Sequence, residues 1–158
     1  MKLHIGILGP HTTTDDQYQL GIEVGRCIAE AGAILFCGGL DGMMRAAAEG
    51  AKSAGGQTVG ILPGIDKAAA NEFIDIAIPT DLGAYRNALL VRSCDVVIAI
   101  HGAYGTLSEL AFALRLKVPV VGLRTWEVHR NGAPDPGIHV APTAAEAVAL
   151  ALKLGRGK

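Results

Sequence analysis

The sequence predicts an α/β fold of three layers: a Rossmann-like parallel sheet with helices on both faces. Short apolar runs alternate along the chain with stretches of helical periodicity, roughly ten to sixteen residues long. Hydrophobic residues make up 50% of the 158 residues and aromatic residues only 4%, so the core must consist mainly of Ala, Val, Ile and Leu. The 21 glycines gather at junctions between segments rather than in a low-complexity run. We expect one domain over residues 1–158.

The N-terminal half predicts four strands and two helices. We expect strands over residues 3–8, 33–37, 57–62 and 73–78, and helices over about 15–31 and 45–54. Thr14, Asp15 or Asp16 can cap the first helix by accepting its first N–H groups, and Gly32 ends it. The second helix is rich in small residues, which allows it to pack closely.

The C-terminal half continues the alternation. We expect helices over about 80–93, 104–116 and 144–154, strands over 95–100 and 118–123, a loop over 126–137, and a last edge strand over 138–140. Thr143 and Glu146 have the spacing of a capping box before the last helix. Because parallel strands end at one edge of a sheet, the turns that follow them should meet there, where such folds bind ligands.

Three glycine-rich turns are expected at that edge, and they supply the candidate ligand-binding residues. A turn between a strand and a helix presents free backbone N–H groups and the positive end of a helix, which favour phosphate. Gly38 and Gly39 could instead form a tight turn between a strand and a helix with no ligand. Asp41 could instead cap the helix that follows. Thr106 can donate to a phosphate or cap its helix, and His101 can contact a ligand or pack. The candidates are Gly9, Pro10, Gly38, Gly39, Asp41, Gly42, Met43, His101, Gly102, Ala103, Tyr104, Gly105 and Thr106.

Two charged residues are candidates for chemistry. Glu109 lies about one turn inside the helix that follows the glycine-rich turn at 102–105. If Leu107, Leu110 and Leu114 form the core face of that helix, Glu109 points to the crevice or to solvent. Arg86 can clamp a phosphate or cover the surface of its helix.

Charge and cysteine content argue against several other classes of protein. The formal net charge is −1 and no basic stripe is present, so we expect no nucleic-acid partner. Cys27, Cys37 and Cys94 are scattered and lack metal-ligand spacing, which predicts apolar packing, no metal site and a reducing, cytoplasmic location. No apolar run approaches the ~20 residues that span a bilayer, and residues 1–5 lead directly into a strand, so we expect neither membrane insertion nor a signal peptide.

Several motifs in combination resemble the SLOG nucleotide-binding superfamily. They are CGGLDGMM at 37–44, GGQTVGILPG at 55–64, Arg86, and GAYGTLSE at 102–109, within a resemblance spanning about residues 3–126. The best-known branch of the superfamily is the "lonely guy" phosphoribohydrolases, long labelled as lysine decarboxylases. The sequence looks most similar to the branch of bacterial proteins related to the molybdenum cofactor carrier protein.

The resemblance implies two alternative functions. In the phosphoribohydrolases the residues that match Arg86 and Glu109 would orient the substrate and assist cleavage of an N-glycosidic bond, releasing base and ribose 5-phosphate. The sequence departs from that branch at His101, Ala103, Asn87 and Ser108, where the branch has proline, glycine, lysine and glutamate. These departures favour a binding or carrier protein for a small phosphate-bearing ligand, either the molybdenum cofactor or a purine nucleotide. The resemblance also implies a homodimer or homotetramer.

Overall fold

A computed structural model describes residues 1–157 and confirms the predicted α/β fold. Seven parallel strands form one sheet in the order β4-β3-β2-β1-β5-β6-β9, and β7 and β8 form a separate antiparallel hairpin. The strands are β1 (His4–Leu8), β2 (Ile34–Cys37), β3 (Gln57–Leu62), β4 (Ile76–Pro79), β5 (Val96–Ile100), β6 (Val120–Leu123), β7 (His129–Arg130), β8 (Ala133–Pro134) and β9 (Ile138–Val140).

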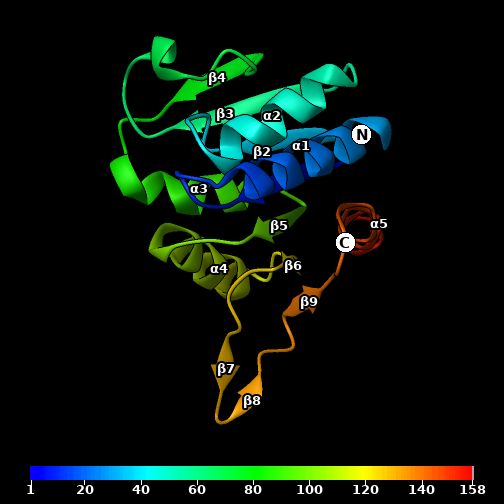
Figure 1. The fold of residues 1–158 in the computed structure, drawn as a ribbon. Coiled ribbons are helices and arrows are strands. Elements are labelled where there is room, and N and C mark those ends of the chain that lie inside the picture. The colour runs from blue at the N-terminus through cyan, green and yellow to red at the C-terminus, as the bar shows by residue number, and fades with distance from the viewer. Residues whose placement is uncertain (158) are drawn as a thin grey trace.

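Helices cover both faces of the sheet (Figure 1). They are α1 (Asp15–Glu30), α2 (Met43–Ser53), α3 (Arg86–Arg92), α4 (Tyr104–Leu116) and α5 (Ala144–Gly155), with short 3₁₀ turns η1 (Lys67–Ala69) and η2 (Gly83–Tyr85). Helices α1, α2 and α5 pack on one face, and α3 and α4 pack on the other. None of the helices within residues 1–157 has the length and apolar character needed to cross a membrane.

Alternation along the central strands supplies a separate core to each face. In β5, Ile98 and Ile100 belong to the cluster under α1, α2 and α5, whereas Val97 and Ala99 belong to the cluster under α3 and α4. A strand buried on both faces has no polar side, which explains the continuous apolar run in its sequence.

Helices α1 and α2 cross at close range because small residues meet at their contact. A side-chain carbon added at Gly25 would overlap the carbonyl of Ala47, and one added at Gly50 would overlap the carbonyl of Ile22. The small residues of α2 therefore serve contact with α1 as well as with the sheet.

Several predicted boundaries were wrong, and local hydrogen bonds or backbone angles explain each difference. The strand expected over 73–78 begins only at Ile76, since the Thr58 hydroxyl donates to the Phe73 carbonyl and accepts the Asp75 N–H, two backbone groups that a strand ladder would otherwise use. The helix expected from about residue 80 begins at Arg86, because Asp81 and Gly83 have φ values of 57° and 54°.

The capping predictions were confirmed in part. Thr14 caps α1 and forms a complete capping box with Gln17. Thr143 accepts the backbone N–H of Glu146, but the Glu146 carboxylate bonds to the Thr143 hydroxyl instead of its backbone N–H. Asp41 does not cap α2, whose N-cap is Gly42. The segment expected to be a loop over 126–137 contains the β7–β8 hairpin.

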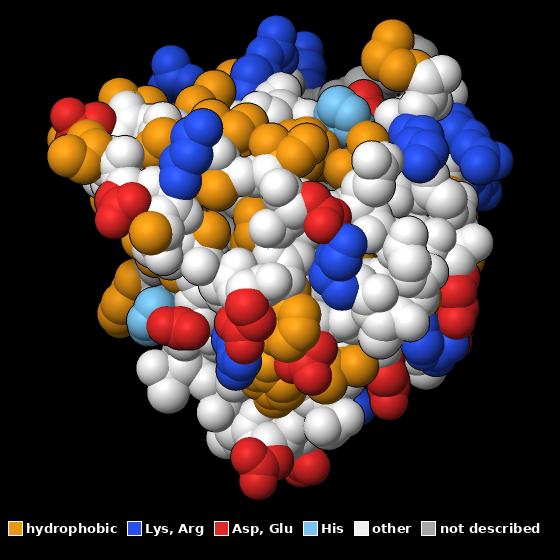
Figure 2. Space-filling view, turned by 90° about the horizontal axis from the view of Figure 1, so that it is seen from above, with side chains coloured by type: hydrophobic (Ala, Val, Ile, Leu, Met, Phe, Trp, Pro, Cys, Tyr) orange, Lys and Arg blue, Asp and Glu red, His pale blue; other side chains and the backbone are white. Residues whose placement is uncertain are grey.

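Apolar side chains are exposed near the β4 edge of the sheet. Ile76 and Ile78 of β4 are 53% and 39% exposed, and Leu82, Tyr85 and Leu89 are also exposed nearby in sequence. Figure 2 looks down on this end of the molecule and shows hydrophobic side chains scattered between charged ones. Exposed apolar groups on an edge strand are typical of surfaces that contact other proteins.

Candidate functional site

The candidate site lies where the strand order reverses, between β1 and β5 at the carboxyl edge of the sheet. From β1 the chain proceeds to β2, β3 and β4 on one side, whereas β5, β6 and β9 lie on the other. The loops that leave β1 and β5 therefore diverge, and open α/β sheets bind their ligands in the crevice that such a divergence creates.

The glycine-rich turn after β2, residues 38–42, packs against the loop after β1 and against Asn71. Gly42 has a φ of 65°, and a side chain there would overlap the carbonyls of Pro10 and His11. The N–H of the fully buried Met43 donates to the Pro10 carbonyl at 3.0 Å. Gly39, with a φ of 76°, accepts the backbone N–H of Asn71 at 2.9 Å. These contacts hold the turn after β2 against the loop after β1 and against Asn71.

The turn after β5 brings the start of α4 to the crevice. His101 adopts a left-handed φ of 50° and Gly102 a φ of 131°. A side chain at Gly102 would come within 2.6 Å of the Thr106 Cβ atom, so the turn can fold back on α4 only without one. Helix α4 begins after Ala103, and within residues 1–157 no side chain caps its first N–H groups. Those groups and the positive helix end face the crevice.

Residues after β6 hold this turn in place. The Thr125 hydroxyl donates to the His101 carbonyl at 2.5 Å, and the Trp126 indole N–H donates to the Ala103 carbonyl at 3.2 Å. Sequence reasoning missed both residues, together with Arg124. Their position directly after a strand that ends at the ligand edge was the signal that could have identified them.

An inner cavity of about 230 Å³ lies where the starts of α2, α3 and α4 meet the loops that follow β1 and β2. Its charged and hydroxyl groups are deeply buried: Arg86 is 8% exposed, Glu109 7% and Thr106 2%. The cavity is lined by Gly9, Pro10, His11, Leu40, Met44, Arg86, Asn87, Ala103, Gly105, Thr106 and Glu109.

Three buried polar atoms beside the inner cavity have no partner. Within the described residues, Arg86 Nε, Arg86 Nη1 and Thr106 Oγ1 make no hydrogen bond. The Arg86 guanidinium lies against Gly38, where a side chain would occupy the space of both terminal nitrogens. Gly38 therefore allows the guanidinium to sit beneath the cavity. Thr106 lies inside α4 and does not cap it.

The sequence left two orientations open for Glu109, the crevice or solvent, and the structure places it beside the inner cavity. Helix α4 turns Thr106, Glu109, Leu110 and Ala113 inward, whereas Leu107 and Leu114 are only half-buried. Burial raises the pKa of Glu109 to about 7, and the positive charge of Arg86 acts in the opposite direction. Among residues 1–157 the two groups form no ion pair within 4 Å, so neither neutralises the other directly.

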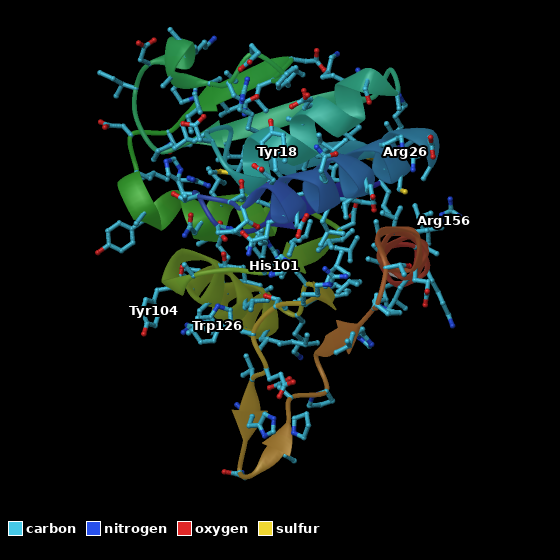
Figure 3. The ribbon with its side chains drawn as sticks, viewed as in Figure 1. Tyr18, Arg26, His101, Tyr104, Trp126 and Arg156 are labelled. Carbon is cyan, nitrogen blue, oxygen red and sulfur yellow. The ribbon has the colours of Figure 1, made fainter. Side chains whose placement is uncertain are left out.

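An outer cavity of about 420 Å³ adjoins the inner one, since Pro10 and Ala103 line both. Burial lowers the pKa of His101, and the charge of Arg124 lowers it further, so both effects favour the neutral imidazole. Figure 3 shows the positions of His101, Tyr104 and Trp126 around this part of the molecule. The outer cavity is lined by Pro10, Thr12, Gln17, His101, Gly102, Ala103, Arg124, Thr125 and Trp126.

The structure brings together most, but not all, of the candidate residues. Seven line the inner cavity: Gly9, Pro10, Arg86, Ala103, Gly105, Thr106 and Glu109. His101 and Gly102 join Pro10 and Ala103 around the outer cavity. Gly39, Gly42 and Met43 belong to the packed turn described above, Asp41 is exposed, and Tyr104 is 80% exposed against Trp126.

Two positions at which the sequence departs from the phosphoribohydrolase pattern contact each other. Asn87 Nδ2 donates to Ser108 Oγ at 3.2 Å. The lysine and glutamate expected there are thus replaced by two neutral groups that satisfy one another. Within residues 1–157, no group of three His, Cys, Asp or Glu side chains is arranged to hold a metal ion.

Comparison with known proteins finds relatives that share the whole fold. The chain is similar to the molybdenum cofactor binding protein of the phototrophic bacterium Rippkaea orientalis, with 33% identity, a TM-score of 0.88 and 98% of both chains covered. It is similar to the molybdenum cofactor carrier protein of Chlamydomonas reinhardtii, with 35% identity, a TM-score of 0.85, and 99% of this chain and 100% of the other covered.

A third relative belongs to the hydrolase branch. The cytokinin riboside 5'-monophosphate phosphoribohydrolase of Mycobacterium tuberculosis is 33% identical over 146 residues, which cover 81% of this chain and 76% of the relative. A sequence model described as the SLOG cluster4 family matches residues 2–148. The resemblance inferred from the motifs is therefore confirmed, and the chain belongs to the SLOG cluster4 family.

Proposed function

We propose that the protein binds a phosphate-bearing, nucleotide-derived ligand and acts as a binding or carrier protein of the molybdenum cofactor carrier type. One observation carries the proposal: a buried guanidinium and a buried hydroxyl border one cavity, and within the described residues 1–157 Arg86 Nε, Arg86 Nη1 and Thr106 Oγ1 are unpaired.

The physical argument starts from the cost of burying polar groups. A charged group removed from water without a hydrogen-bond partner destabilises the folded state, and most buried polar groups are therefore paired. In the part of the chain that the structure describes, Arg86 and Thr106 lack such partners, and they lie beside a start of α4 that no side chain caps. A phosphate in the inner cavity accepts hydrogen bonds from the guanidinium, the hydroxyl and the helix N–H groups together.

The molybdenum cofactor fits these donors as cargo, because it is a pterin that carries a phosphate. Similarity to two proteins that are named for this cofactor supports the assignment. The Asn87–Ser108 pair supports binding over hydrolysis, since it leaves the site without the lysine and the first glutamate of the hydrolase pattern.

The second candidate function is that of a nucleoside 5'-monophosphate phosphoribohydrolase. Arg86 and Glu109 are both present at the same cavity, and a relative carries that activity in its name. With its pKa raised to about 7, Glu109 is partly ionised at neutral pH. The ionised form can stabilise the oxocarbenium-like transition state of N-glycosidic cleavage.

Replacing Arg86 by Met should weaken ligand binding but raise the free energy of unfolding. Loss of charge-assisted hydrogen bonds should weaken the binding of AMP and ribose 5-phosphate about 10- to 100-fold, measured by calorimetry. The ligand-free variant should unfold at higher urea concentration than the wild type, gaining about 1–3 kcal/mol, since an unpaired buried charge is removed.

Arg92→Met provides the matched control. Arg92 lies on the same helix but is exposed, so this variant should change neither the affinity nor the stability appreciably. Affinities within twofold of the wild type in Arg86→Met would contradict the assignment of the inner cavity as the phosphate site.

Incubation with a panel of purine and pyrimidine monophosphates separates the carrier from the hydrolase. For a carrier, chromatography should detect no free base with the wild type or with Glu109→Gln, while both bind ligand. For a hydrolase, the wild type should release base, and Glu109→Gln should lower the rate about 10²–10³-fold while retaining binding. Base release by the wild type would overturn the carrier proposal.

The pH dependence of stability tests the burial of Glu109. The folded-state pKa of about 7 lies above the ordinary value of 4.5. The contribution of Glu109 to the free energy of unfolding is therefore full below pH 4.5 and is lost as pH rises through 7. Glu109→Gln removes the titration. Between pH 5 and 8 the variant should gain about 2–3 kcal/mol relative to the wild type, measured by urea unfolding at each pH. A difference independent of pH would mean that Glu109 is not buried as described.

A further inference from the structure

We infer that the outer cavity is a second subsite of the same ligand, and that Trp126 is the platform on which a planar heteroaromatic ring, a purine or a pterin, stacks. This inference rests on the proposed phosphate site, because it assigns the remainder of the ligand that this site would hold.

The first argument is the position of the outer cavity. It shares Pro10 and Ala103 with the inner cavity, so a ligand anchored by its phosphate at α4 can pass over Ala103 into the larger space. The volume of about 420 Å³ lies in the range typical of small-molecule pockets.

The second argument is that the Trp126 ring is held in place before any ligand arrives. Its indole N–H donates to the Ala103 carbonyl at 3.2 Å, and Tyr104 packs against it with ring centroids 5.8 Å apart at an angle of 34°. Trp126 lines the outer cavity, whereas Tyr104 supports it from the exposed surface. A rigid aromatic wall loses little conformational freedom when another ring stacks on it.

The third argument is the chemistry of the surrounding groups. The neutral His101 imidazole and the Gln17 amide can each donate and accept hydrogen bonds, as the edges of purine and pterin rings require. Gln17 Oε1 already accepts the Thr14 N–H, which leaves its amide nitrogen for a ligand. Arg124 adds a cation at the rim, and guanidinium groups also stack on aromatic rings.

Trp126 is the one tryptophan of the chain, so its fluorescence reports on the outer cavity alone. The wild type should be titrated with three ligands: AMP, a pterin phosphate, and ribose 5-phosphate, which has the phosphate but no ring. The two ring-bearing ligands should quench the emission saturably and bind more tightly than ribose 5-phosphate. Ribose 5-phosphate should bind, measured by calorimetry, without comparable quenching.

Trp126→Leu should weaken the binding of the two ring-bearing ligands about 10- to 100-fold, as expected when a stacking partner is lost. The affinity for ribose 5-phosphate should stay within about twofold of the wild-type value. Trp126→Phe keeps an aromatic face without the indole N–H, and it should retain most of the affinity. Circular dichroism checks that both variants are folded.

The outcomes separate this inference from the proposal beneath it. If ribose 5-phosphate binds and the ring-bearing ligands bind no more tightly, the outer cavity is not a ring subsite, although the phosphate site stands. Equal weakening of all three ligands in Trp126→Leu would show that Trp126 supports only the turn after β5, which also overturns the inference. If none of the three binds the wild type, the proposed function fails and this inference fails with it.

Discussion

The site depends on one constraint: the guanidinium of Arg86 is buried, and within residues 1–157 its Nε and Nη1 atoms have no hydrogen-bond partner. Burying a charge in this way costs stability, and the surrounding structure is arranged to hold it. Gly38 lacks the side chain that would displace the guanidinium, and the backbone of α3 begins at Arg86 itself. Gly38 and the start of α3 at Arg86 together hold the guanidinium below the start of α4.

Two neighbouring groups, Thr106 and Glu109, are placed beside this cation by the turn after β5 and by α4. Thr106 is placed by its contact with Gly102, and the turn that contains Gly102 is held by Thr125 and Trp126. Glu109 is close enough for its pKa to be affected by Arg86, yet it forms no ion pair of 4 Å or less in the part of the chain described. A site whose charges are already in place can bind an anion without paying to reorganise its side chains.

The sequence was informative about the fold because periodicity and buried-strand composition are local signals. The continuous apolar run of β5 and the glycine turn after it predicted both a central strand and the edge at which ligands bind. The start of α3 could not be predicted in this way, since Asp81 and Gly83 adopt left-handed angles and donate their N–H groups to the carbonyls of Gly64 and Pro63, which are distant in sequence. The inward face of α4 was misjudged for a related reason. Hydrophobicity favoured the three leucines, but helix packing turned Glu109 toward the cavity.

For the site, sequence motifs identified the residues of the inner cavity better than those of the outer one. Arg86, Thr106 and Glu109 belong to a motif, whereas Trp126 and Arg124 belong to a loop that carries no motif and becomes part of the site only when β6 lies beside β5. Conversely, Gly42 and Met43 are in a motif but serve to join two loops. Motif membership alone could not separate residues that border the ligand space from residues that support it.

The most direct measurement of the central claim is a crystal structure of the protein with ribose 5-phosphate bound. The account predicts phosphate oxygens within hydrogen-bond distance of Arg86 Nε or Nη1, of Thr106 Oγ1, and of the first N–H groups of α4. A phosphate bound elsewhere, with the Arg86 and Thr106 donors still unpaired, would contradict it.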